Sequence, residues 1–115
     1  MEILDKKINK SEFAKKYLTY YETISKAVVD IENEIIAVDS ELHSDLEALL
    51  LENGSKQKNL WGINIHPLRE KEDFVEFTSL INIRPHQNNR SMEVEDCEIK
   101  SRIMKIIDKL IDYGH

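Results

Sequence analysis

The spacing of apolar positions changes several times along the chain, and each change predicts a new element. Residues 2–8, with an isoleucine near each end, predict a short edge strand. Asn9 or Ser11 can cap the helix that follows, because a short side-chain oxygen accepts a free backbone N–H there. The positions of that helix that share its predicted buried face are Phe13, Tyr17, Leu18 and Tyr21.

Residues 24–38 fit two structures. Their apolar side chains recur at alternating steps of four and three residues, which forms a helical stripe. The same segment is dense in β-branched residues, which favours two strands. Asn33 tolerates the left-handed backbone that a tight turn between such strands requires. The pattern alone therefore leaves both a helix and a β-hairpin open.

The next segment, ELHSDLEALLLENG, predicts a second helix with Ser40 as its N-cap. Gly54 follows the last apolar position, where a helix commonly ends in the left-handed conformation. The predicted buried stripe of this helix consists of Leu42, Leu46, Leu49 and Leu50.

Two strands are predicted after this helix. Residues 61–65 alternate apolar with small or polar side chains, which is the period of a strand. Residues 75–84 alternate in the same way as far as Pro85, which cannot donate to a hydrogen-bonded ladder. If the two strands form a hairpin, Asn64 lies near Glu76 and Gly62 lies near Thr78.

Asp96 can cap a last helix, whose apolar positions run at helical spacing from Ile99 to Leu110. The predicted order of elements is (β)αββαββα. We therefore expect an α+β fold: a four-stranded, mainly antiparallel sheet packed with three helices on one face. At 115 residues, the chain is expected to form a single domain over residues 1–115.

Composition and charge limit the classes of function that the protein can have. The net charge of -6 argues against a general nucleic-acid-binding protein, because phosphate contacts need a basic surface. Cys97 is the only cysteine, so no intramolecular disulfide can form. No apolar run approaches the roughly 20 residues that a membrane span needs. These features predict a cytoplasmic protein that does not enter a membrane.

Four segments carry a resemblance to a known family: VVDIE, ELHSD, LWGINIHP and FTSLINIRPHQNNRSMEV. The sequence resembles a family of small bacterial and archaeal proteins that is catalogued as a domain of unknown function, over about residues 26–112. The resemblance implies no activity and leaves any cofactor unknown. Residues 37–40 lack the glycines that often precede the ELHAD-like segment in that family. The resemblance nevertheless favours the hairpin for residues 26–38.

The polar loop after residue 84 is the first candidate site. No acidic residue occurs from Thr78 to Met92, in a chain with 22 acidic residues among 115. Arginine offers a planar fork of donors that suits carboxylate or phosphate, so the loop predicts a site for a small anionic ligand. Alternatively, the amides satisfy the loop backbone and Arg84 pairs with a nearby Glu. The predicted ligand-binding residues are Arg84, Gln87, Asn89, Arg90, Ser91 and Ser55.

The second candidate is a metal site. His43 and Glu47 are i, i+4 neighbours on the predicted helix, and such a pair can bind a divalent metal. A third ligand would have to come from elsewhere, and no zinc motif is present. The alternative is a partly exposed histidine in an acidic first turn, where acidic side chains complement the helix dipole.

The third candidate is one face of the predicted sheet, with Asn64, His66, Glu76 and Thr78. If the helices cover only the other face, this one meets solvent or a partner. Leu80 and Phe74 on that side predict a surface for a homodimer.

Two function classes stay open. The first is a non-enzymatic module that binds an anion or another protein. The second is a small metal-dependent or hydrolytic enzyme that uses His43, Asp45 and Arg84. No nucleophile motif, P-loop or dinucleotide-binding fingerprint is present, which favours the first class.

Overall fold

The computed structural model describes residues 1–114 and has an α+β fold. Its helices are α1 (Lys10–Tyr17), α2 (His43–Glu52) and α3 (Cys97–Leu110). Its strands are β1 (Glu2–Leu4), β2 (Ile8–Asn9), β3 (Ser25–Asp30), β4 (Ile35–Val38), β5 (Leu60–Ile65), β6 (Val75–Glu76) and β7 (Ile111–Asp112). A five-stranded sheet of order β1-β4-β3-β5-β6 has only antiparallel neighbours, and β2 pairs with β7 in parallel.

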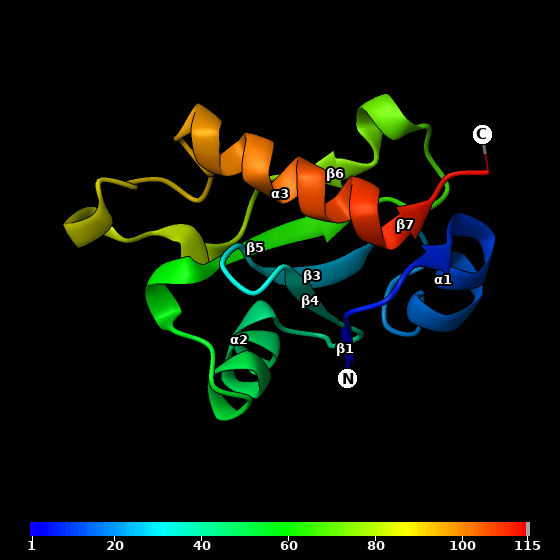
Figure 1. The fold of residues 1–115 in the computed structure, drawn as a ribbon, viewed down its shortest axis with the longest axis horizontal. Coiled ribbons are helices and arrows are strands. Elements are labelled where there is room, and N and C mark those ends of the chain that lie inside the picture. Colours follow the sequence, from blue (N-terminus) through cyan, green and yellow to red (C-terminus); the bar gives the residue numbers. More distant parts are fainter. Residues whose placement is uncertain (115) are drawn as a thin grey trace.

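The helices cover both faces of the sheet, not one face as the sequence analysis predicted. Figure 1 shows α3 on one side of the sheet and α2 on the other. The reason is that β3 and β4 carry buried apolar side chains on both faces. The larger core packs α1 and α3 against residues such as Ala27, Val29 and Trp61. The smaller core consists of Val28, Ala37, Leu46, Leu50 and Leu60.

Residues 25–38 form the β3–β4 hairpin, which confirms the hairpin and excludes the helix. The carboxylate of Asp30 organises its turn by accepting the backbone N–H and the side-chain amide of Asn33. Burial alone would raise the pKa of Asp30, but these hydrogen bonds and one from Ser55 hold it below its usual range. The left-handed residue of the turn is Glu34 (φ 58°), not Asn33 as expected.

The predicted strand over residues 75–84 is wrong beyond Glu76. Asn64 lies beside Glu76 as expected, but β6 ends there and the chain leaves the sheet. Thr78 therefore does not pair with Gly62 and forms a bridge with Glu93 instead. The side chain of Asn82 then occupies the neighbouring edge of β5. Its Oδ1 accepts the N–H of Gly62 at 2.8 Å, and its Nδ2 donates to the C=O of Gly62 at 2.9 Å. A side-chain amide thus replaces the backbone of a longer strand. The main sheet has five strands, rather than the four predicted, because β1 also pairs with β4.

α1 and α3 begin at caps that the sequence predicts. The side chain of Asn9 accepts the N–H of Ser11, and Asp96 caps α3 in the same way. α1 is shorter than predicted and ends at Tyr17, so Tyr21 lies outside it. Within residues 1–114, no helix is long and apolar enough to cross a membrane.

α2 begins later than predicted. Ser40 lies two residues before its N-cap, Leu42, and its hydroxyl accepts the N–H of Leu42. Leu42 is 52% exposed instead of buried, whereas Leu46 and Leu50 are buried as predicted. Gly54, at φ 98°, follows the helix in the left-handed conformation that the sequence indicates.

Gly62 lies directly beneath residues 79–82. A Cβ at this position would lie 2.5 Å from Cβ of Ser79 and 2.6 Å from its Oγ. We therefore expect Gly62→Ala to lower the free energy of unfolding by about 1–3 kcal/mol, the usual cost of overpacking. Urea denaturation measures the change. Adding Ser79→Gly should recover part of the loss, and strictly additive losses in the double variant would contradict the close approach.

Candidate functional site

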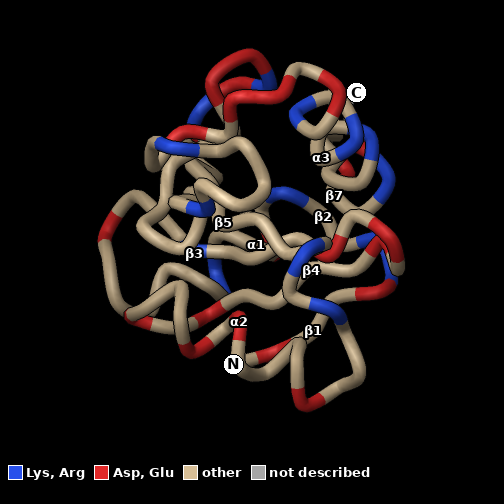
Figure 2. Tube along the Cα trace, turned by 90° about the vertical axis from the view of Figure 1, so that its left-hand side faces the viewer, with Lys and Arg blue, Asp and Glu red and all other residues tan. Residues whose placement is uncertain are grey.

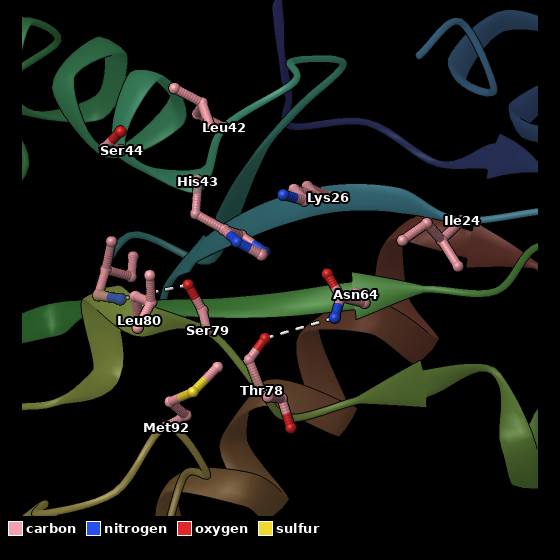
Figure 3. A pocket seen from close by; sticks show the side chains of 11 residues that line it. Ile24, Lys26, Leu42, His43, Ser44, Asn64, Thr78, Ser79, Leu80 and Met92 are labelled. Atoms are coloured by element: carbon pink, nitrogen blue, oxygen red, sulfur yellow. Dashed lines mark hydrogen bonds between the residues drawn. The ribbon is translucent and has the colours of Figure 1, made fainter. Parts of the chain in front are cut away.

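A cavity of about 360 Å³ opens on the sheet face that α2 only partly covers. Its floor is formed by β3 and β5, one wall by the start of α2, and the other wall by residues 78–81 and Met92. Figure 3 shows the side chains that converge on it from these parts of the chain. We call it the sheet pocket and define it by Lys26, Leu42, His43, Asn64, Leu80 and Met92.

The rim of the sheet pocket is apolar and the floor is polar. Leu42, Leu80 and Met92 are 52%, 71% and 40% exposed, so three large apolar side chains surround one opening. Clustered exposed apolar side chains commonly mark a binding surface. The floor holds Lys26 and Asn64, which are direct cross-strand partners on β3 and β5. The arrangement suits a ligand with an apolar part and a polar end.

Of the residues that the structure describes, Lys26 is the only charged one that lines the sheet pocket. Among residues 1–114, no carboxylate lies within ion-pair distance of its ammonium. The ammonium lies 5.2 Å from the centroid of the Tyr21 ring, a cation–π contact that holds the side chain over this face. Lys26 therefore offers an unpaired positive charge at the floor.

Asn64 presents an unused acceptor to the sheet pocket. Its Nδ2 donates to Oε1 of Glu76 at 2.8 Å and to the C=O of Thr78 at 3.4 Å. These two bonds fix the orientation of the amide, because only the NH₂ end can donate. The Oδ1 atom is buried and has no hydrogen-bond partner among the described residues. Figure 3 shows it on the side of the amide that faces His43 and Lys26.

His43 is neutral in this environment. Its Nε2 lies 2.7 Å from the carbonyl oxygen of Ile63, so this nitrogen carries the proton and donates. Burial lowers the pKa of His43, and the nearby charge of Lys26 lowers it further, while the bond to Ile63 acts in the opposite direction. Nδ1 is left as an acceptor, and the charge of the pocket comes from Lys26 alone.

His43 and Glu47, the predicted metal ligands, each bond to a different group of the protein. His43 uses Nε2 on the backbone of β5, and Glu47 pairs with Arg84. Within residues 1–114, no three His, Cys, Asp or Glu side chains lie close enough together to hold a metal ion. The contacts of His43 and Glu47 are those of residues that attach α2 to the rest of the fold.

Arg84, the central residue of the predicted anion site, is 3% exposed and fully bonded inside the protein. Its three guanidinium nitrogens donate to the C=O of Ile81 (3.0 Å), the C=O of Gln57 (2.9 Å) and a carboxylate oxygen of Glu47 (3.2 Å). The guanidinium also lies 4.9 Å from the ring centroid of Trp61. This geometry matches the alternative in which Arg84 pairs with a nearby Glu.

The rest of the polar loop also bonds internally. Asn89 is buried, and its Nδ2 donates to three backbone carbonyls. Gln87 donates to a carbonyl of a neighbouring segment. The N–H groups of Arg90 and Ser91 and the Ser91 hydroxyl all donate to one oxygen of Glu95, at 2.8–2.9 Å. These bonds hold the pKa of Glu95 below its usual range. The loop does form an anion-binding geometry, and a carboxylate of the chain itself fills it.

The remaining sequence candidates lie in three places. Ser55 is buried against Asp30, to which its hydroxyl donates at 2.6 Å. The sheet face predicted from Asn64 and its neighbours is the one that holds the sheet pocket. Phe74, expected at a homodimer surface, is fully buried, so that part of the expectation is wrong. Leu80 is exposed as expected and lies at the pocket rim.

Sequence reasoning missed Lys26, Leu42 and Met92. Each comes from a different segment, and no local pattern marks any of them as part of a site. The sequence carried a signal for only one wall of the pocket. That signal is the acid-free run from Thr78 to Met92, which contributes five of the residues that line the pocket.

Because Arg84 is buried and paired, its loss should reduce stability before it affects any ligand. We expect Arg84→Ala to lower the free energy of unfolding by about 3 kcal/mol, since it leaves Glu47 poorly solvated and without its partner. Urea denaturation checks this, with exposed Arg90→Ala as a control that should change it by less than about 0.5 kcal/mol. Glu47→Gln should recover part of the loss in the Arg84→Ala background. Equal stability of the two single arginine variants would contradict the structural role.

The lowered pKa of His43 predicts a pH dependence of stability. Below the ordinary histidine pKa of 6.5, the unfolded chain binds a proton more readily than the folded one. Stability is therefore full above that pH and falls as the pH decreases, by at most about 1.4 kcal/mol per pH unit. Urea denaturation at pH 7.5 and 5.5 should show a smaller difference in His43→Gln, which can still donate to Ile63. An unchanged difference in the variant would contradict this role.

Comparison with known proteins gives a family but no activity. No curated protein and no solved structure matches the chain. One family model, described as a protein of unknown function (DUF5674), matches residues 2–110. This match covers nearly the whole sequence and confirms the expectation that the chain is a domain of unknown function. The chain belongs to the DUF5674 family of proteins of unknown function.

Proposed function

We propose that this protein is a non-enzymatic binding module and that the sheet pocket is its ligand site. The observation that carries the proposal is the composition of the pocket: an apolar rim, one unpaired lysine and no acidic residue. The chain has 22 acidic residues among 115, and Figure 2 shows Asp and Glu positions in many separate stretches of the trace. A lining without acid therefore favours a ligand that carries negative charge.

The electrostatics of the floor support an anion with an apolar body. Lys26 is half-buried, so its charge is less screened than that of an exposed lysine. Glu76, which holds Asn64, is exposed, and solvent therefore weakens its repulsion of a bound anion. Leu42, Leu80 and Met92 lose exposed apolar surface when a ligand covers them, which adds a favourable hydrophobic contribution.

We assign the anion-binding group to Lys26 rather than to the polar loop. The loop donors at Arg84, Asn89 and Ser91 already bond to acceptors within the chain. An external anion would have to displace Glu47 or Glu95 to reach them. The sheet pocket requires no such displacement.

The enzymatic alternative needs His43, Asp45 and Arg84 around one cavity. Only His43 lines the sheet pocket. Asp45 lies in the first turn of α2, where its carboxylate accepts the hydroxyl of Ser40, and Arg84 is buried behind residues 78–82. The separation of the three side chains favours binding over catalysis.

Isocaproate, a branched alkyl carboxylate, tests the proposal, with uncharged isocaproamide as its match. We expect isocaproate to shift the backbone amide NMR signals of Leu42, Asn64 and Leu80, and to bind more tightly than isocaproamide because of Lys26. Lys26→Met, which keeps the apolar stem, should remove this preference. Exposed Lys6→Met is the control and should keep it. If neither compound moves a pocket signal, the proposed function is wrong.

A further inference from the structure

The floor of the sheet pocket carries two unsatisfied groups of opposite kind. The Lys26 ammonium has no anionic partner among residues 1–114, and the buried Asn64 Oδ1 has no donor. A buried acceptor without a donor costs about 1–3 kcal/mol. A ligand N–H that reaches Oδ1, once the side chains that enclose it move aside, recovers part of that free energy. A complementary ligand therefore needs both an anion and a neutral N–H.

The two groups are close neighbours. Lys26 and Asn64 are directly opposite residues of antiparallel strands, so their Cβ atoms lie about 4.5–5.5 Å apart. The Lys26 side chain is long and rotatable, so its ammonium can pair with a carboxylate that lies next to an N–H bonded to Asn64. The C-terminal residue of a peptide has this arrangement, with both groups attached to one Cα.

The rest of the pocket determines which ligand side chain fits and whether the ligand nitrogen is neutral or charged. The apolar rim at Leu42, Leu80 and Met92 suits an aliphatic side chain, and about 360 Å³ is near the lower limit for ligand pockets. A free amino acid would bring an ammonium group beside Lys26, and no acidic residue lines the pocket to balance it. An amide N–H avoids this repulsion.

We infer that the sheet pocket binds the C-terminal residue of a peptide or protein that ends in an aliphatic side chain. The carboxylate pairs with Lys26, the amide N–H of the same residue donates to Oδ1 of Asn64, and the side chain packs on the apolar rim. Residues before the last one leave through the open side of the pocket. This inference rests on the proposed function and adds the class of the ligand.

Four leucine-based probes test the inference by NMR titration of the same pocket signals: N-acetyl-leucine, N-acetyl-leucinamide, leucine and isocaproate. We expect N-acetyl-leucine to bind about tenfold more tightly than each of the others, which lack respectively the carboxylate, the neutral nitrogen and the N–H. A longer peptide, acetyl-Ala-Ala-Leu with a free carboxylate, should bind at least as tightly as N-acetyl-leucine. Weaker binding of the longer peptide would mean that a small acylated amino acid, not a peptide end, is the ligand.

Two variants test the contributions of Asn64 and Lys26 to ligand affinity one at a time. Asn64→Leu removes the acceptor and should reduce the affinity for N-acetyl-leucine to that for isocaproate, with little change for isocaproate itself. Lys26→Met should reduce both, and Lys6→Met should reduce neither. Urea denaturation of each variant shows that it is folded.

The outcomes distinguish the inference from the proposed function. Binding of isocaproate with equal binding of N-acetyl-leucine would overturn the inference and leave the proposed function intact. No shift with any of the five probes would overturn both.

Discussion

The structure after β6 depends on one side chain, the amide of Asn82. It bonds to both backbone groups of Gly62 and to the C=O of Met92. A carboxamide carries the same donor and acceptor as a peptide group, so it satisfies the edge of β5 where β6 has ended. The backbone of residues 79–82 can therefore turn out of the sheet. That turn creates the second wall of the sheet pocket, and a continued strand would have left a flat face.

A wall of irregular structure lacks the backbone hydrogen bonds of a regular strand, so other interactions must hold it in one conformation. Here the means are buried polar side chains in which every nitrogen donates at least one hydrogen bond, chiefly Arg84 and Asn89. In a low-dielectric interior, such bonds resist exchange, because an unbonded donor is costly there. The residues that make this loop polar therefore stabilise the wall. Within the sheet pocket, the groups left without a partner are at the floor, in Lys26 and Asn64.

Periodicity predicted most of the elements but not their limits. The hairpin of β3 and β4 was ambiguous, because alternating steps of four and three residues also suit a helix; Asp30, which organises its turn, was the missed local signal. Residues 75–84 kept a strand pattern because their apolar side chains do reach the two cores: Phe77 packs on the larger core and Ile81 on the smaller one. An alternating pattern reports which side chains reach a core, and here two residues of one predicted face reach opposite cores. It does not report whether a backbone partner is present, and at Gly62 the partner is a side chain.

The same limit explains why the sequence suggested a binding loop in place of a binding pocket. Composition shows that donors are concentrated between Arg84 and Ser91, but not whether their acceptors belong to the chain. The acceptor of Arg84 on α2 lies 37 residues away, and Glu95 lies just beyond the acid-free run. Once these internal acceptors are identified, the unsatisfied groups of the face are those at its floor. The lysine and the amide of that floor come from two strands that pair only in the folded sheet, so their complementarity arises from register and not from any local motif.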